Sequence, residues 1–199
     1  MGNIEKFDAM ASRYDTEDKD IVAKIIADEI AKNLSDTEGK TLLDYGCGTG
    51  LVGLRLLKHF SSAVFVDASQ NMVSELEKKL EELEITNAIA LCLDLEEKSF
   101  KLSADYIIVV QTLLHIKNPE PLIAELFGLL NPGGHLIIVD FDKNEAIISS
   151  EVHNGFVQSE LICALKSIGF SDASAYTFYS GEKLFMRTDA SLFLLDAEK

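Results

Sequence analysis

The chain has 199 residues, of which 47% are hydrophobic and 26% are charged, a composition typical of a globular protein. This length suits one sizeable α/β domain, so we expect residues 1–199 to form a single domain. The formal net charge of −15 disfavours a nucleic acid or an anionic membrane surface as a partner. The charge either serves solubility alone or also attracts a cationic substrate.

Three scattered cysteines, Cys47, Cys92 and Cys163, form no C-x-x-C pair, so we expect neither a disulfide framework nor a metal site. The N-terminus lacks the basic start and apolar run of a signal peptide. The apolar runs are also shorter than the roughly 18 residues that a membrane-spanning helix needs. These features predict a cytoplasmic protein, and they leave its oligomeric state open.

The first 32 residues predict a helical extension before any strand. One face of the second half of this extension carries Ile21, Val22, Ile25, Ile26 and Ile30. We expect residues 1–38 to form a helical cap over the carboxyl edge of a sheet, and residues 39–199 to form the core domain.

Five short apolar runs, bounded by turn residues, predict buried strands at 41–45, 63–66, 88–93, 106–110 and 135–139. Helical patterns at 51–60, 72–83, 122–129 and 161–168 follow the first, second, fourth and fifth of these strands. Two last strands are expected near 176–179 and 192–195, joined by a long loop at 180–190. The alternation predicts a doubly wound, Rossmann-like α/β fold: a seven-stranded, mostly parallel sheet with helices on both faces.

A glycine-rich turn, Gly46-Cys47-Gly48-Thr49-Gly50, connects the first predicted strand to a helix. Glycine is needed where the backbone takes a positive φ, or where a ligand leaves no room for a Cβ atom. Ligands of open α/β sheets bind outside the carboxyl ends of the strands, which is where this turn lies. The turn therefore predicts a cofactor site, either for a dinucleotide or for S-adenosylmethionine.

The residues around the turn favour S-adenosylmethionine. A dinucleotide site has the pattern G-x-G-x-x-G, whereas Leu51 stands here in place of the third glycine. Asp44, two residues before Gly46, would repel a pyrophosphate but would attract an ammonium group. S-adenosylmethionine has an ammonium, a sulfonium and no phosphate.

Two further acids follow the next predicted strands. Asp67 ends the second strand, where a carboxylate can accept both hydroxyls of a ribose; the alternative is a residue of a surface turn. Asp94 follows the third strand, where its carboxylate can accept the amino hydrogens of an adenine flanked by Leu93 and Leu95. The alternative for Asp94 is a helix cap.

In this order, the motifs resemble those of the class I S-adenosylmethionine-dependent methyltransferases, over about residues 5–170. The first motif is matched by residues 42–50, the second by Val66-Asp67-Ala68-Ser69, and the third by Leu93-Asp94-Leu95. Residues 106–115 resemble the fourth motif, and residues 130–136 resemble the turn before the fifth strand. The opening Phe7-Asp8-x-x-Ala11-x-x-Tyr14-Asp15 is similar to that of the quinone-biosynthesis group of small-molecule methyltransferases.

This resemblance implies S-adenosylmethionine as the cofactor, a small-molecule methyl acceptor and an antiparallel seventh strand. It also implies a methionine beside the adenine, here Met72, and an opening segment that closes over the cofactor. Two departures make a quinone acceptor doubtful: His115 is followed by Ile116 rather than by a second histidine, and quinone methyltransferases are longer. The expected cofactor-binding residues are Tyr14, Asp44, Gly46, Cys47, Gly48, Gly50, Asp67, Ala68, Met72, Asp94, Leu95 and Gln111.

Methyl transfer by in-line displacement depends mainly on alignment, and a hydroxyl or amine acceptor also needs a proton acceptor. His115 is the first candidate for this base, and the alternative is a partly buried histidine that orients a loop. Tyr14 is the second catalytic candidate. The other candidate proton acceptors are Gln111 after the fourth strand, Asp140 and Asp142 after the fifth, and His153 just before the next helix. The alternative for His153 is a loop residue at a helix start.

Two other functions fit the same cofactor fold. One is a non-catalytic regulatory protein that binds S-adenosylmethionine, and it would lack an acceptor pocket beside the methyl group. The other is an NAD-dependent oxidoreductase, which Leu51 and Asp44 disfavour for the reasons given above.

Overall fold

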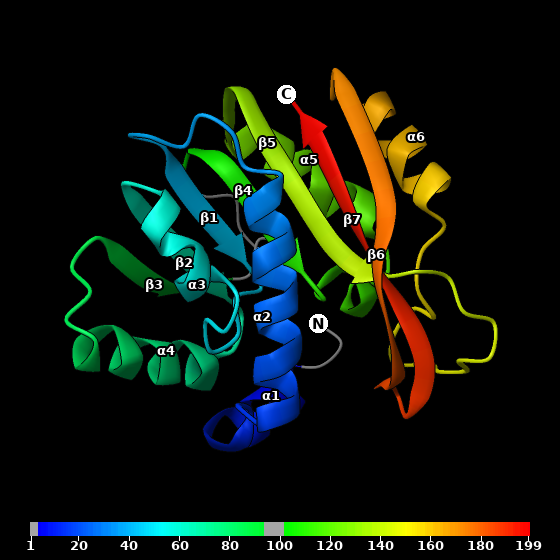
Figure 1. Ribbon diagram of the computed structural model, residues 1–199, viewed down its shortest axis with the longest axis horizontal. Coiled ribbons are helices and arrows are strands. Elements are labelled where there is room, and N and C mark those ends of the chain that lie inside the picture. Colours follow the sequence, from blue (N-terminus) through cyan, green and yellow to red (C-terminus); the bar gives the residue numbers. More distant parts are fainter. Residues whose placement is uncertain (1–3, 94–101) are drawn as a thin grey trace.

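The computed structural model describes residues 4–93 and 102–199, and these fold around one seven-stranded sheet (Figure 1). The strands are β1 (Thr41–Tyr45), β2 (Ser62–Asp67), β3 (Ala88–Cys92), β4 (Ala104–Val110), β5 (Leu130–Phe141), β6 (Asp172–Phe185) and β7 (Thr188–Glu198). Their order is β3-β2-β1-β4-β5-β7-β6, and among these strands only β7 runs opposite to the direction of the other six. The predicted Rossmann-like fold is confirmed.

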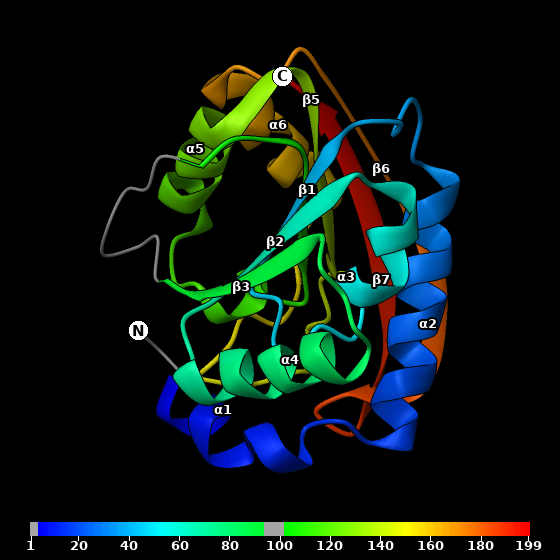
Figure 2. The same ribbon diagram turned by 90° about the vertical axis from the view of Figure 1, so that its left-hand side faces the viewer.

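Helices cover both faces of the sheet. Figure 2 shows α2 (Glu17–Lys32) and α3 (Gly53–Leu56) on one face, with α5 (Pro119–Leu129) and α6 (Gln158–Ile168) on the other. The remaining helices are α1 (Ile4–Met10), α4 (Gln70–Glu82), η1 (Ala11–Arg13), η2 (Leu57–His59) and η3 (Leu113–His115). None of the described helices is long and apolar enough to cross a membrane.

The central strands are apolar on both of their faces because helices cover both sides of the sheet. Ile107, Ile108, Ile137 and Leu195 are all 0% exposed. Burial of one such side chain stabilises a fold by about 1.5–3 kcal/mol. The centre of the sheet is therefore a rigid support for the loops at its carboxyl edge.

The N-terminal extension lies on the molecule in two different ways. Helix α2 packs along a face of the sheet and buries Ala23, Ile26, Ala27 and Ile30, a stripe with helical spacing. Ile21 is not part of this stripe, because it is 52% exposed. Helices α1 and η1 pack against α4, at the end of the molecule toward which β1 points (Figure 1). Only this first part of the extension matches the expected cap over the carboxyl edge.

The prediction of a long loop at residues 180–190 is wrong. Strand β6 continues to Phe185, and β7 begins at Thr188 after a two-residue turn in which Met186 and Arg187 have φ values of 50° and 63°. Such turns favour glycine and asparagine, so this pair gives no turn signal. A register shift between Gly181 and Phe185 also interrupts the alternation of side chains.

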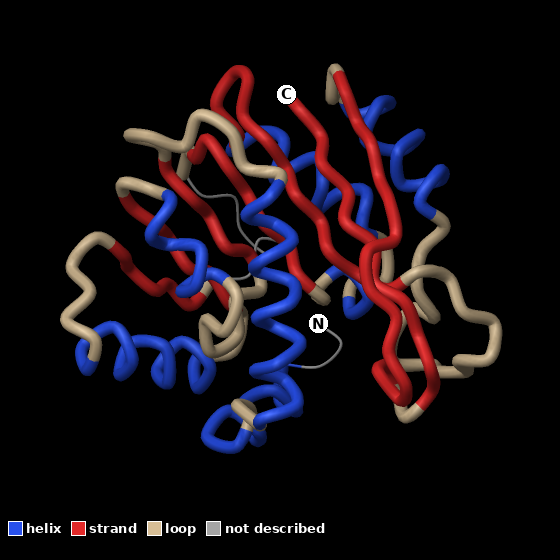
Figure 3. The backbone as a smooth tube through the Cα atoms, viewed as in Figure 1, coloured by secondary structure: helices blue, strands red, loops and turns tan. Residues whose placement is uncertain are grey.

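The hairpin of β6 and β7 extends beyond the strand beside it, as Figure 3 shows. Pairing between β5 and β7 ends at Phe141 and Leu192, whereas β6 and β7 stay paired as far as Phe185 and Thr188. We call residues 181–190 the hairpin tip. The tip stands free of the sheet and beside the carboxyl ends of the parallel strands.

Candidate functional site

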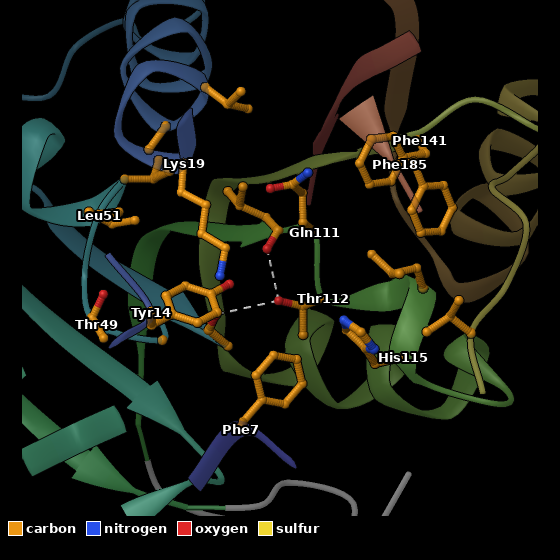
Figure 4. Close-up of a pocket in the computed structure, with 18 of the residues that line it drawn as sticks. Phe7, Tyr14, Lys19, Thr49, Leu51, Gln111, Thr112, His115, Phe141 and Phe185 are labelled. Carbon is orange, nitrogen blue, oxygen red and sulfur yellow. Dashed lines mark hydrogen bonds between the residues drawn. The ribbon is translucent and has the colours of Figure 1, made fainter. Parts of the chain in front are cut away.

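A cavity of about 840 Å³ opens where β1 and β4 end, the point at which the strand order reverses. Open α/β sheets bind their ligands at this point. Figure 4 shows Tyr14, Thr49 and Leu51 on one side of the cavity and Phe141 and Phe185 on the other. The segment that carries Gln111, Thr112 and His115 lies between these two sides.

The glycine turn leaves bare backbone on one wall of this cavity. Gly46 has a φ of 74°, and a Cβ atom there would lie 2.3 Å from Oγ1 of Thr112, so this glycine is required for packing. Gly48 has a φ of 54°, and its Cβ would approach only the Tyr14 ring, at 3.8 Å. Gly48 therefore faces open space in which a ligand can approach the backbone.

The carboxylate of Asp67 accepts two backbone hydrogen bonds at the end of β2. One comes from the N–H of Gly48 and the other from the N–H of Ser69, each at 2.8 Å. Burial raises the pKa of this carboxyl group above its usual range. A carboxylate has about four lone-pair sites, so Asp67 keeps acceptor capacity for a ligand in the cavity.

Asp44 is a buried acid on β1, only 3% exposed, that also lines the cavity. Burial, followed by the nearby charge of Asp67, raises the pKa of Asp44 to about 8, although a hydrogen bond from the Gly53 backbone opposes this shift. A cation beside the group would favour its ionised form. This wall is therefore suited to a positively charged ligand group.

Two acids attach the N-terminal segment to the cavity wall. Asp8 accepts hydrogen bonds from the Ser69 hydroxyl and from the backbone N–H of Asn71. Asp15 accepts a hydrogen bond from the Thr49 hydroxyl and forms an ion pair with Lys79, whose Nζ lies 2.6 Å away. These contacts hold the segment over the glycine turn and bring the rings of Phe7 and Tyr14 into the cavity.

Tyr14 and Lys19 form a contact that the sequence does not indicate. The Nζ atom of Lys19 lies 3.2 Å from the centre of the Tyr14 ring. Burial, followed by the charges of Asp67 and Asp15, raises the pKa of Tyr14, so its hydroxyl stays protonated. Lys19 stands in an acidic helix start that looks like any exposed helix surface, and no sequence pattern distinguishes it.

The segment from Gln111 to Ile116 is held in a strained conformation. Gln111 has a φ of 48°, which is rare for a residue other than glycine, and its N–H bonds to the Val139 oxygen at 2.7 Å. The buried carboxylate of Asp140 accepts the N–H of Leu114 at 3.2 Å. Nε2 of His153 lies 2.8 Å from the Ile116 oxygen. These contacts fix the position of His115, which lies within this segment.

His115 faces the cavity and packs edge-to-face against Phe7, with 5.1 Å between ring centres. Burial, together with the nearby cation of Lys6, lowers the pKa of His115 to about 4. The imidazole is therefore neutral at physiological pH, and one of its ring nitrogens can accept a proton.

The structure brings most of the candidate residues together. Those that line the cavity are Tyr14, Asp44, Gly46, Cys47, Gly48, Asp67, Ala68, Met72, Gln111 and His115. Gly50 does not line it; a Cβ atom there would meet Leu76 at 2.6 Å, so this glycine is required for packing. Asp94 and Leu95 lie outside the described residues. Asp140 and His153 support the segment of His115, and Asp142 bonds to Gln158 and Thr177 instead, each at 2.7 Å.

Comparison with known proteins identifies the family. The model of the methyltransferase domain family matches residues 18–167, which is more than half of the chain. An uncharacterized methyltransferase from Schizosaccharomyces pombe is 26% identical over 161 residues, which cover 71% of this chain and 57% of that protein. The ubiquinone biosynthesis O-methyltransferase of Coxiella burnetii is 30% identical over 108 residues, covering 54% of this chain and 46% of that protein. The chain belongs to the methyltransferase domain family, and it spans about half the length of the curated relatives it matches.

Solved structures agree on the fold. The crystal structure of an S-adenosylmethionine-dependent methyltransferase from Aquifex aeolicus matches with a TM-score of 0.71 and 20% identity, and the match covers 96% of this chain and 97% of that one. The resemblance to class I methyltransferases that the motifs indicate is therefore confirmed at the level of family and fold.

Proposed function

We propose that the protein is an S-adenosylmethionine-dependent methyltransferase that acts on a small-molecule acceptor. The observation that carries this proposal is the cavity in which Asp44 and Asp67 face the open backbone at Gly48. Membership of the methyltransferase domain family supports the reaction class. The names of the relatives, among them an enzyme of ubiquinone biosynthesis, support a small molecule as the acceptor.

The residues present fit the proposed cofactor. Gly48 leaves room beside the backbone, Asp67 has free lone pairs for the ribose hydroxyls, and Asp44 suits the ammonium group. Lys19, beside Tyr14, is the cation available to the carboxylate of the methionine part. When bound, the cofactor supplies a methyl group made electrophilic by the positive charge on sulfur.

The chain itself contributes position and a dry environment. The N-terminal segment, attached through Asp8 and Asp15, covers the cofactor side of the cavity and excludes water from it. The fixed segment of Gln111 to Ile116 holds the acceptor in line. Alignment of this kind contributes up to roughly 7–11 kcal/mol in model reactions, so it is the larger part of the proposed mechanism.

We propose His115 as the group that takes a proton from the acceptor. A pKa of about 4 makes it a weak base, so its contribution should be small. Replacement of His115 by alanine should lower turnover roughly 10-fold and leave the affinity for S-adenosylhomocysteine unchanged. Turnover of the variant is measured as label transfer in the assay described below. A variant with normal turnover would contradict the role as base.

A small acceptor is favoured by the size and charge of the protein. A cavity of about 840 Å³ lies within the usual range of roughly 300–1,000 Å³ for small ligands, and it has to hold both reactants. The net charge of −15 disfavours nucleic acids and anionic membranes. We also propose a cytoplasmic location, where Cys47, Cys92 and Cys163 would stay reduced. One sheet joins the described residues, so we propose that residues 1–199 form a single domain.

The test uses purified protein, S-adenosylmethionine labelled on its methyl group, and a protein-free extract of cell metabolites. Label should move into a new small molecule that passes an ultrafiltration membrane, and the rate should scale with protein concentration. Label that stays with added protein or RNA would contradict a small acceptor. Calorimetric binding of S-adenosylhomocysteine without any transfer would favour the regulatory protein. Thermal stabilisation by NADH but not by S-adenosylhomocysteine would favour the oxidoreductase.

A further inference from the structure

The half of the cavity that lies away from the glycine turn has an apolar wall. Phe141, at the end of β5, and Phe185, in the hairpin tip, stack with 4.3 Å between their ring centres and an interplanar angle of 6°. Both are buried, and both line the cavity together with Phe7, Val152 and Leu184. Figure 4 shows the stacked pair on the side of the cavity opposite Tyr14, near His115.

The charged side chains of this half stand at its rim. Lys6 and Glu151 pair with each other at 3.3 Å, and their side chains are 61% and 63% exposed. Glu182 and Lys183 of the hairpin tip are also exposed. Among the described residues, the inner wall therefore carries no ionised side chain, because His115 is neutral. An ionic group placed against this wall would lose its hydration without gaining a partner.

The hairpin tip closes this half in a conformation that costs stability. Lys183, Met186 and Arg187 all have positive φ values although none is glycine. Met186 is 56% exposed at the cavity mouth, and Ile21 of α2, which also lines the cavity, is 52% exposed. Strained backbone and exposed apolar side chains are usual where a protein surface is shaped for a ligand.

We propose that the hairpin tip selects the methyl acceptor, and that the acceptor is an uncharged molecule whose flat apolar body packs against Phe185. This inference rests on the proposed methyltransferase function, because it assigns the second half of the same cavity. The acceptor presents its nucleophilic atom toward His115 and leaves its remaining apolar surface against the stacked rings. A cationic acceptor, which the acidic surface would attract, finds no carboxylate among the described residues of this inner wall.

Three phenols of similar size test the charge preference. They are 4-ethylphenol, which is neutral, 4-hydroxyphenylacetate, which is an anion, and tyramine, which is a cation. Each is titrated by calorimetry into protein saturated with S-adenosylhomocysteine. We expect 4-ethylphenol to bind at least about 10-fold more tightly than either ion. Each ion loses the hydration of its charged group and gains no ion pair on the inner wall in return. Equal affinities, tighter binding of either ion, or no binding of 4-ethylphenol at millimolar concentration would overturn the proposal.

Two variants test the role of the tip. Phe185→Ala should weaken 4-ethylphenol binding by about 10-fold or more, while Phe185→Leu, which keeps an apolar side chain, should lose less. Phe170→Ala is the matched control, because Phe170 is also buried, packs on Phe127 at 4.9 Å between ring centres, and does not line the cavity. The control should bind 4-ethylphenol with unchanged affinity. If Phe185→Leu and Phe185→Ala also bind it with unchanged affinity, the hairpin tip does not select the acceptor.

Binding of S-adenosylhomocysteine, measured first on every variant, separates the two proposals. If the unmodified protein fails to bind it, the proposed function fails. If every variant binds it with unchanged affinity while the phenols show no preference, only the assignment of the acceptor half fails. A Phe185→Ala variant that no longer folds would lose S-adenosylhomocysteine binding as well, and Phe185→Leu then decides the outcome.

Discussion

Replacement of Asp67 by alanine should weaken the binding of S-adenosylmethionine at least 10-fold, and up to about 100-fold, by removing two charge-assisted hydrogen bonds to the ribose. The same carboxylate holds the N–H groups of Gly48 and Ser69, so the loss also loosens the wall at which the cofactor would rest. Affinity is measured by calorimetry with S-adenosylhomocysteine, which does not react. Asp67→Asn, which keeps the shape of the side chain, should lose less than Asp67→Ala.

Asp105→Ala provides the matched control for this prediction. Asp105 also accepts two hydrogen bonds, in this case from the backbone N–H and the hydroxyl of Thr41, at 2.9 and 3.0 Å, but it does not line the cavity. Its loss should lower the melting temperature without changing the dissociation constant. If the control loses affinity as strongly as Asp67→Ala, the effect reflects general destabilisation, and the ribose assignment is wrong.

The parts of the site that the sequence predicts are those encoded by local patterns. Asp67 and the glycine turn each follow an apolar strand, and in a parallel sheet the carboxyl ends of strands meet at one edge. The order of elements alone therefore places the turn beside Asp67. The observed N–H bond from Gly48 to Asp67 agrees with that expectation.

The parts that the sequence does not predict depend on contacts between distant segments. Lys19 lines the cavity at the start of α2, next to the segment that Asp15 attaches to Thr49 and Lys79. The hairpin tip depends on a turn of Met186 and Arg187 that has none of the residues usual for such turns. Asp140 and His153, which the sequence offers as candidate proton acceptors, instead bond to the backbone of the segment that carries His115. Their residue types alone do not separate the two roles.

The buried acid Asp44 should make cofactor binding depend on pH. In the empty protein its pKa is about 8, so at pH 7 most molecules carry a protonated Asp44. An ammonium group beside it favours the carboxylate and lowers this pKa, so the complex holds fewer protons than the empty protein. Affinity should therefore rise with pH, by at most about 10-fold per pH unit, and should level off above the pKa of about 8.

Calorimetry in two buffers with different ionisation enthalpies, such as phosphate and Tris, counts the protons released at pH 7. S-adenosylhomocysteine should release a large fraction of one proton, whereas 5′-methylthioadenosine, which lacks the ammonium group, should release almost none. Asp44→Asn keeps an acceptor for the Gly53 N–H but has no charge, so it should abolish the release and weaken binding at pH 8 by about 10-fold or more. Burial also raises the pKa of Asp67. If the Asp44→Asn variant still releases a proton on binding, Asp67 is the group that titrates. The ammonium group would then not lie beside Asp44. The comparison of the two ligands thus locates the charged end of the cofactor within the cavity independently of any measurement of turnover.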